Sequence, residues 1–260
     1  MRQGVSELAA FYASPLGGTA SRMVSRKVAE AWRSAAGLDL LAVGYATPFV
    51  GQLDRRLRRV VAAMPAAQGV ERWPPAAANA ACLVDEGSLP FPNAFFDRVL
   101  AAHALEESDS PSALLAEIAR VLSPSGRVIL VAAARSGAWA HVESTPFGQG
   151  RAFTRGQLER LVREADLTPT SWTRALYAPP ARWAARWGVA FEQVGAWLWP
   201  GFSGLVLMEA TKMTPAVRPR GAPARAGSRR PVFSPAPIGG NVNTPVPVGR
   251  DLRRKKVHPA

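Results

Sequence analysis

Two stretches of the sequence place polar side chains where a small ligand could bind. Asp85 directly follows the apolar run ACLV, residues 81–84, and His103 follows the apolar run VLAA, residues 99–102. Open α/β sheets bind ligands beyond the carboxyl ends of their strands, so both side chains are expected at one sheet edge. A carboxylate there can accept hydrogen bonds from a ligand. A histidine there could act as a base or could simply line the pocket.

The elements that would position these side chains alternate between strands and helices along the chain. Apolar runs typical of buried parallel strands occur at residues 38–44, 59–64, 81–84, 97–105 and 126–134. Two later strands are predicted at 167–177 and 204–212. Helical spacing of apolar residues predicts helices at 15–35, 52–59, 111–122, 153–167 and, rich in tryptophan, at 180–199. This alternation indicates the α/β class, with a doubly wound parallel sheet covered on both faces.

The charge is unevenly distributed and divides the chain. The net charge is +13, but residues 211–260 alone hold eleven Lys or Arg and one acid, Asp251. Residues 212–260 are rich in proline, glycine and arginine, and they hold too few bulky apolar residues to offset the entropy of folding. We therefore expect an N-terminal helical segment at 1–37, an α/β domain at 38–211 and a disordered basic tail at 212–260.

Several functional classes have little support in the composition. The single cysteine, Cys82, excludes a disulfide framework and a cysteine zinc cluster, and the three histidines lie far apart, so no metal is expected. The first residues lack the apolar block of a secretory signal. These features favour a cytoplasmic protein.

One block carries a specific family pattern. Residues 84–130 read VDEGSLPFPNAFFDRVLAAHALEESDSPSALLAEIARVLSPSGRVIL. They contain an acid after the third strand, Leu-Pro-Phe-Pro, a strand that begins with Phe-Asp, the run His-Ala-Leu-Glu, and a helix closed by a Pro-x-Gly turn. This block closely resembles the class I S-adenosylmethionine-dependent methyltransferases of the type 11 group. The resemblance implies a Rossmann-like sheet, mostly parallel with an antiparallel last strand, and S-adenosyl-L-methionine as cofactor.

The resemblance also implies roles for individual residues. Asp85 would accept a hydrogen bond from the adenine amino group, Leu89 would pack on the ring, and His103 would face the cleft as a candidate catalytic residue. The matching cofactor-binding positions are Gly44, Tyr45, Ala46, Met64, Asp85, Glu86, Leu89 and Ala102. Asp97, Glu117 and Arg120 are expected to be structural. Direct in-line methyl transfer needs mainly alignment of the reacting atoms, so the family pattern does not require a dedicated base.

The sequence departs from the family pattern at two places in the cofactor site. The family loop reads acid-x-Gly-x-Gly-x-Gly, whereas the matching positions here hold Ala42, Gly44, Ala46 and Pro48. After the second strand, Met64 stands where the family has an acid that holds the ribose hydroxyls. Gln68 is the nearest polar substitute, and Glu71 could reach the site only if its loop folds back. The helix that usually follows this strand is expected to be replaced by a proline-rich stretch.

Two functions are therefore open at this point. The first is a working S-adenosylmethionine-dependent methyltransferase of unknown acceptor, favoured by the intact block at 84–130. The second is a catalytically inactive binding or regulatory protein on the same fold, favoured by the lost acids. The loop at 139–157 either lines an acceptor pocket, with His141, Phe147 and Arg151 as substrate residues, or is a plain surface loop. The basic tail is either a solubilising extension or a weak electrostatic contact for nucleic acid or an acidic membrane surface.

Overall fold

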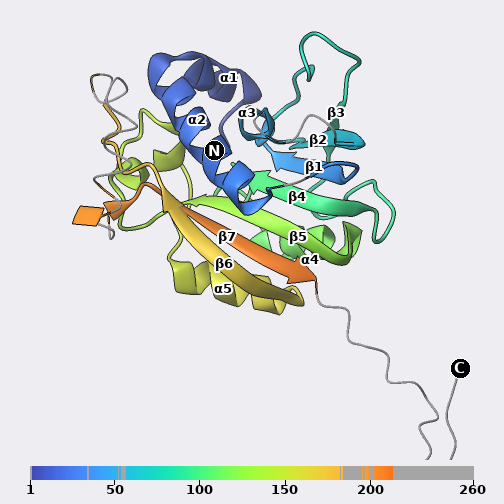
Figure 1. Ribbon diagram of the computed structural model, residues 1–260. Helices are drawn as coiled ribbons and strands as arrows, with labels where there is room; N and C mark the ends of the chain where they lie inside the picture. Colours follow the sequence, from blue (N-terminus) through green and yellow to red (C-terminus); the bar gives the residue numbers. More distant parts are fainter. Residues whose placement is uncertain are drawn as a thin grey trace, which may run out of the picture. The chain divides into compact units, whose positions relative to one another are not determined.

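A seven-stranded sheet forms the centre of the fold (Figure 1). The computed structural model describes residues 2–33, 35–51, 53, 57–181, 183, 195, 197–198 and 202–212. The strands are β1 Asp39–Gly44, β2 Arg59–Pro65, β3 Ala81–Val84, β4 Phe96–Ala102, β5 Leu122–Ala133, β6 Leu167–Ala175 and β7 Leu205–Lys212. Their order is β3-β2-β1-β4-β5-β7-β6. Strand β7 is antiparallel to both β5 and β6, and the pairs among β1 to β5 are parallel. The predicted Rossmann-like sheet with an antiparallel last strand is confirmed.

Helices cover both faces of this sheet (Figure 1). The α-helices are α1 Val5–Ala13, α2 Pro15–Ala31, α3 Thr47–Val50, α4 Pro111–Val121 and α5 Arg155–Glu164. Two short 3-10 helices, η1 Ala138–His141 and η2 Pro146–Gly148, lie between α4 and α5 in the chain. Because successive strand side chains point to opposite faces, β1 contributes Leu41 to one core and Leu40 to the other. Helices α4 and α5 pack on the first face, and α2 and α3 pack on the second.

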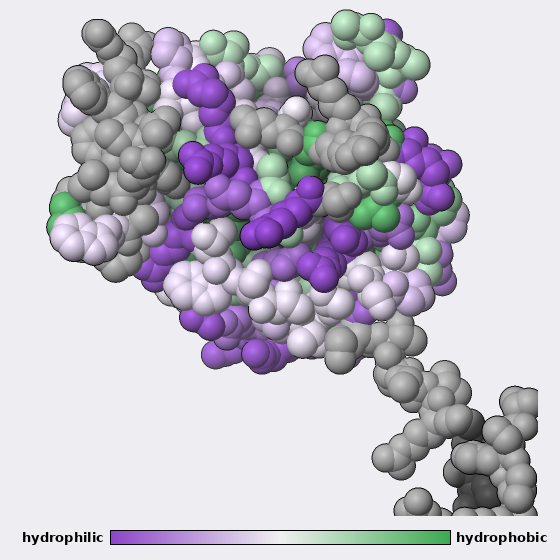
Figure 2. All heavy atoms as spheres, in the orientation of Figure 1, coloured by the Kyte–Doolittle hydropathy of each residue, from purple (hydrophilic) through white to green (hydrophobic). Residues whose placement is uncertain are grey.

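Helix α2 is amphipathic. It buries Met23, Val24 and Val28 against the sheet and exposes Arg26 and Glu30, which form an ion pair at 2.9 Å. Figure 2, in the same orientation as Figure 1, shows hydrophilic side chains across this side of the molecule. The periodicity predicted a helix as far as residue 35, but α2 ends at Ala31. Trp32 leaves the helical conformation there, and its indole nitrogen donates to Glu209 at 3.1 Å.

One predicted boundary needs correction at the sheet edge that faces α1. Strand β4 was predicted to continue to residue 105, but it ends at Ala102 because His103 adopts a left-handed backbone with φ of 49°. Helix α1 lies within the predicted helical segment at 1–37, although no separate helix was predicted at its position. The proline-rich stretch after β2 forms turns and no helix across residues 66–80, as expected. Asp97 is structural, as its carboxylate accepts hydrogen bonds from the Asp39 amide and the Ser123 hydroxyl.

Three predictions fall wholly or largely outside the residues described above. They are the disordered tail, which the structure does not describe beyond Lys212, the tryptophan-rich helix at 180–199, and the first part of the basic helix at 52–59. They remain predictions, as do the proposed domain boundaries at 1–37, 38–211 and 212–260. The end of that basic helix was predicted wrongly, because residues 57–58 are not helical and Arg59 begins β2. Within the described residues, no helix is long and apolar enough to cross a membrane.

Candidate cofactor site

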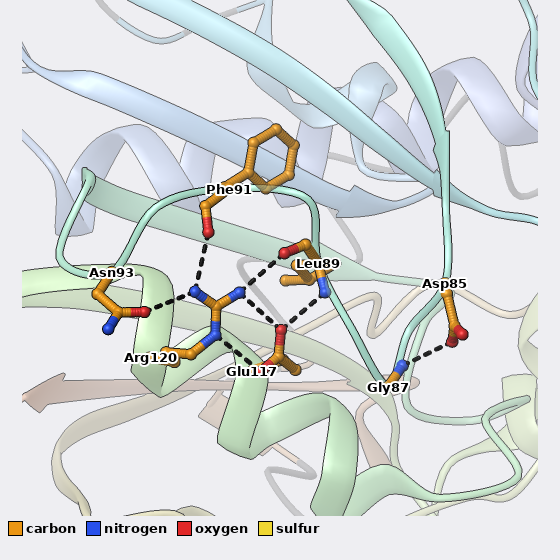
Figure 3. A network of polar contacts seen from close by, with 7 residues as sticks. All are labelled: Asp85, Gly87, Leu89, Phe91, Asn93, Glu117 and Arg120. Carbon is orange, nitrogen blue, oxygen red and sulfur yellow. Dashed lines mark hydrogen bonds and ion pairs between the residues drawn. The ribbon is translucent and has the colours of Figure 1, made fainter.

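The loop after β3 presents Asp85 to solvent. Asp85 is exposed, and one of its carboxylate oxygens accepts a hydrogen bond from the Gly87 amide at 2.9 Å (Figure 3). Its backbone forms an isolated antiparallel bridge with Ser88, so the loop turns back sharply. Leu89 then points inward and is buried in the core. This geometry leaves a carboxylate at the carboxyl edge of the sheet with accepting capacity to spare.

Glu117 and Arg120 of α4 form hydrogen bonds with this loop (Figure 3). Glu117 accepts the Leu89 amide at 2.7 Å and pairs with Arg120 at 2.8 Å. Arg120 also donates to the carbonyl oxygens of Leu89 and Phe91 and to the Asn93 side chain. The hydrogen bond from Arg120 is the main reason that the pKa of Glu117 lies below its usual value. Glu117 and Arg120, which were expected to be structural, therefore brace the loop that carries Asp85.

Gly44, the one retained loop glycine, is required by backbone packing. Its φ is 75°, and a Cβ at this position would lie 2.4 Å from the carbonyl oxygen of Ala102 on β4. The next amide, of Tyr45, donates to that same carbonyl at 2.9 Å. Ala46 is fully buried, and the turn leads into α3, with Pro48 in its first turn as predicted. The strand-to-helix turn is thus preserved, but its contacts are made within the protein.

The end of β2 is covered by apolar side chains. Met64 is fully buried and packs in one cluster with Leu8, Tyr45 and Ala62. The loop after β2 does fold back, since Glu71 accepts a hydrogen bond from the Tyr45 hydroxyl at 2.7 Å. Burial and this contact raise the pKa of Tyr45. Both groups that could have replaced the missing ribose-binding acid are engaged within the protein, because the Gln68 side chain donates to the His103 carbonyl at 3.2 Å.

His103 lies in an aromatic environment at the end of β4. His103 is 2% exposed, and the centroid of its ring lies 4.8 Å from the centroid of the Phe147 ring. Its Nε2 lies 2.6 Å from the oxygen of the Tyr12 hydroxyl. Burial lowers the pKa of His103 to about 3 and raises the pKa of Tyr12. Both groups are neutral, and the direction of the hydrogen bond between them depends on the tautomer of the imidazole. In either tautomer the Tyr12 hydroxyl occupies Nε2, so a catalytic role for His103 stays a prediction.

The N-terminal segment, residues 2–13, lies along this same edge. Arg2 forms an ion pair with Glu86 at 2.7 Å, and the Gln3 amide donates to Glu107 at 2.8 Å. The Val5 amide donates to the Gln68 carbonyl at 2.8 Å. The sequence predicted a helical segment at 1–37, but it did not predict a separate helix at residues 5–13 or a place for residues 2–13 beside the cofactor site. The available signals were the apolar spacing of VSELAAFYA, the Ser-Pro break after it, and Glu7, whose carboxylate accepts the Gly4 amide at 3.3 Å.

The three predicted substrate residues are not brought together. Phe147 is buried against His103, Phe11 and Trp139. His141 is exposed on η1, and its ring contacts the Arg135 carbonyl at 3.2 Å. Arg151 is exposed and lines a cavity of about 460 Å³ together with Arg2, Glu106 and Glu107. Only Phe147 thus lies next to the candidate catalytic histidine.

A larger groove, of about 1340 Å³, opens between the two N-terminal helices and the loop after η1. Its lining includes Phe11, Tyr12, Leu16, Glu143, Pro146 and Gln149. Tyr12 connects this groove to His103 through its hydroxyl. None of the predicted cofactor residues lines this groove or the smaller cavity. Among the described residues, no group of three or more His, Cys, Asp or Glu could hold a metal ion.

The residues of this edge do not fit S-adenosylmethionine as they stand. Of the eight predicted positions, Gly44, Tyr45, Ala46, Met64, Leu89 and Ala102 are buried by the protein itself. Glu86 is ion-paired with Arg2, and only Asp85 is exposed. Leu8 contacts the cluster around Met64, at the position where the family holds the ribose. The carboxylate at the adenine position is therefore exposed, and the positions that would hold the ribose are buried by the protein itself.

Comparisons with known proteins agree with the fold. Residues 41–130 match the profile of a family described as "Methyltransferase domain". A stretch of 50 residues is 42% identical to the ubiquinone/menaquinone biosynthesis C-methyltransferase UbiE of Ralstonia nicotianae, and it covers 19% of this chain. The chain matches only 21% of the length of that relative.

Two solved structures resemble the whole described domain. A chain from the complex between the Haloferax volcanii Trm112 methyltransferase activator and a methyltransferase aligns with a TM-score of 0.59 and 16% identity, over 82% of this chain and 100% of that one. A methyltransferase from Thermotoga maritima aligns with a TM-score of 0.54 and 16% identity, over 80% and 96% of the two chains. At this identity the likeness shows the fold.

Proposed function

Since the chain belongs to the class I S-adenosylmethionine-dependent methyltransferases, we propose that it transfers a methyl group by direct displacement to an acceptor still to be identified. The observation that carries the proposal is the loop of residues 85–93. It keeps the family pattern, Glu117 and Arg120 brace it, and it leaves Asp85 exposed at the carboxyl edge of the sheet. A brace of this kind has a clear use if the loop must present a fixed surface to a ligand.

The proposal gives separate tasks to the two sides of the edge. Asp85 would accept a hydrogen bond from the adenine, whereas Leu89 is buried in the core and would contact the ring only after the loop moved. The cofactor, when bound, would supply the methyl group. We place the acceptor in the groove of about 1340 Å³, whose wall includes Tyr12. Phe147 packs against His103, which the Tyr12 hydroxyl connects to this groove. The positions of His141 and Arg151 give them weaker support as substrate residues.

Calorimetric titration with S-adenosylhomocysteine tests this function. We expect the wild-type chain to bind and Asp85→Ala to bind at least tenfold more weakly, because a hydrogen bond to a charged group contributes about 1.5–3 kcal/mol. Glu164→Ala, which removes an exposed acid from the end of α5, is the matched control and should bind like the wild type. No binding to any form at millimolar ligand would refute the function. Binding that Asp85→Ala does not weaken would refute the site.

A second function is favoured by one specific observation. The ribose side of the cleft is filled, and Glu71 and Gln68 use their polar groups within the protein. A methyltransferase-fold protein without activity, serving as a binding or regulatory protein, would show this arrangement permanently. It would fail to bind S-adenosylhomocysteine even after the N-terminal segment is displaced. The two functions therefore differ in whether the cleft can open.

The basic tail, residues 212–260, adds a separate proposal that rests on sequence alone. Its excess of Lys and Arg would attract nucleic acid or acidic lipid headgroups, and screening by salt would weaken that attraction strongly. A cytoplasmic location is likewise a proposal. Binding of the full chain to anionic vesicles and to duplex DNA, measured over a range of salt concentrations, would compare the two partners.

A further inference from the structure

We infer that the N-terminal segment, residues 2–13, is an internal plug that fills the ribose side of the cofactor cleft and must leave it before S-adenosylmethionine can bind. The inference rests on the proposed function for the identity of the ligand. The position of the plug rests on the contacts of the segment alone. These contacts reach three strand ends that form the edge, those of β2, β3 and β4.

The apolar part of the plug is centred on Leu8. Its side chain is fully buried in a cluster with Tyr45, Ala62 and Met64. A carboxylate in place of Met64, as the family has, would be buried against Leu8 without a partner, which is costly. Methionine suits this contact, because its thioether side chain fills irregular apolar gaps. The departure at Met64 is therefore matched to the N-terminal segment of this chain.

The polar part of the plug consists of main-chain and charged contacts on both sides of Leu8. Val5 donates its amide to the Gln68 carbonyl at 2.8 Å, beyond the end of β2. Arg2 pairs with Glu86 beyond β3 at 2.7 Å. The Gln3 amide donates to Glu107, beyond β4, at 2.8 Å. The segment thus uses hydrogen-bonding groups that would otherwise face a ligand at this edge.

Tyr12, near the C-terminal end of the plug, contacts the aromatic side chains at the ends of β1 and β4. The Tyr12 ring stacks on that of Tyr45 with centroids 5.8 Å apart, and its hydroxyl reaches His103. Only Ser14, in an extended conformation, separates α1 from α2. Because α2 is packed on the sheet and α1 joins it through one extended residue, a change of backbone angles at Ser14 would swing α1 out.

Several buried polar atoms beside the plug lack hydrogen-bond partners, which lowers the stability of the closed arrangement. Within the described residues, five buried side-chain atoms lack a hydrogen-bond partner, and four of them lie at or beside the plug: Arg2 Nε, Gln3 Oε1, Gln68 Oε1 and Glu106 Oε2. Each unmet polar atom costs free energy in the closed state, because it would be hydrated in an open one. The plug is therefore held less firmly than its contacts alone would suggest, as a displaceable element must be.

A reversible crosslink tests both the position of the plug and its effect. A Cβ added at Gly69 would lie 3.5 Å from Cγ1 of Val5, so the double substitution Val5→Cys, Gly69→Cys should form a disulfide between plug and β2 loop. Cys82→Ser in the same full-length chain removes the one native thiol. Calorimetry with S-adenosylhomocysteine then compares the oxidised and the reduced forms of one protein.

We expect the disulfide to form readily and the oxidised form to bind at least tenfold more weakly than the reduced form. Failure to crosslink in a folded chain would overturn the position of the plug. Equal binding by the oxidised and reduced forms would overturn its effect. If the crosslink forms but neither form nor the wild type binds at millimolar ligand, the proposed function fails, and the crosslink still supports occupation of the cleft by residues 2–13.

A second test does not alter Gly69, where a cysteine would strain the backbone because φ is 87°. Leu8→Ser weakens the plug, and Leu158→Ser removes an equally buried leucine from α5, away from the cleft. Opening the cleft raises apparent affinity in proportion to the gain in the binding-competent population. We expect Leu8→Ser to bind S-adenosylhomocysteine about tenfold more tightly than the wild type and Leu158→Ser to match the wild type. Weaker or unchanged binding by Leu8→Ser would contradict the inference.

Discussion

The two sides of the sheet edge differ in whether their residues are exposed to a ligand or buried by another part of the chain. On the adenine side, Asp85 is exposed on a loop that Glu117 and Arg120 hold in place. On the ribose side, Met64 and Tyr45 are buried under a helix of the same chain. The first side keeps the residues of its family, and the second has lost them. A departure from a binding motif can therefore reflect a new internal partner for those positions, in addition to a loss of binding.

Among the substitutions that test this comparison, Gly44→Ala is expected to change the free energy of unfolding most. A Cβ there would meet the Ala102 carbonyl at 2.4 Å, and alanine would be strained at a φ of 75°. We expect Gly44→Ala to lower the free energy of unfolding by about 3 kcal/mol or more, measured by urea denaturation. Gly156→Ala on α5 is the control, because nothing lies within 4 Å of its added Cβ. A tolerated Gly44→Ala would mean that this glycine is kept for a ligand.

A pH-dependent effect is expected from two buried groups beside the plug. Burial raises the pKa of Glu106 to about 7, so stability from its neutral form is present at low pH and is lost as the pH rises toward 7. Burial lowers the pKa of His103 to about 3, so stability from its neutral form is present above its unfolded pKa of about 6.5 and is lost at lower pH. Between about pH 4.5 and 6.5 the two contributions oppose each other.

Glu106→Gln should expose the contribution of His103. The amide keeps an oxygen that can accept the Ala133 amide, as Glu106 does at 3.2 Å, but it does not titrate. Relative to the wild type, the variant should gain stability with rising pH from 4.5 to 6.5, by about 1 kcal/mol per pH unit. Urea denaturation at several pH values measures this slope. Parallel pH profiles for the two proteins would show that Glu106 is not held neutral.

A smaller effect is expected on the adenine side. Arg120→Ala removes the hydrogen bonds to the carbonyls of Leu89 and Phe91 and the pair with Glu117. Because these groups are partly exposed, we expect a loss of about 2 kcal/mol in unfolding free energy. Arg26→Ala, which breaks an exposed pair on α2, should cost less than about 0.5 kcal/mol. Equal effects of the two substitutions would show that the loop does not depend on its brace.

Much of the fold could be predicted from the sequence because its strands are continuous apolar runs and α4 lies in a specific family block. The predicted ends of helices were wrong where tertiary contacts decide them, as at Trp32, whose indole nitrogen donates a hydrogen bond to Glu209 on β7. Helix α1 was missed because it is short and buries only Leu8 fully. Its place on the cleft depends on pairs such as Arg2 with Glu86, which are 84 residues apart. Local periodicity carries no information about such pairs.

The candidate site divides in the same way. The position of Asp85 at the sheet edge and the structural role of Glu117 and Arg120 were predicted, because one contiguous motif contains all three, but the contacts of Glu117 and Arg120 with the loop were not. Gly44 was predicted as a cofactor-binding position, and the structure shows that the backbone of β4 requires a glycine there. Glu71 reaches Tyr45 only because the loop after β2 folds back, and no pattern in that loop indicates this. The sequence therefore showed which residues had changed, and the structure was needed to show what they now contact.

Hydrogen exchange of the full-length chain, with and without saturating S-adenosylhomocysteine, tests the central claim most directly. If residues 2–13 are a plug, ligand binding should speed exchange of the amides in α1, including that of Leu8. It should slow exchange of the Leu89 amide, which the ligand-bound loop would hold more firmly. Slower exchange in α1 on binding would show that the helix closes over the ligand as a lid, and that result would contradict the account.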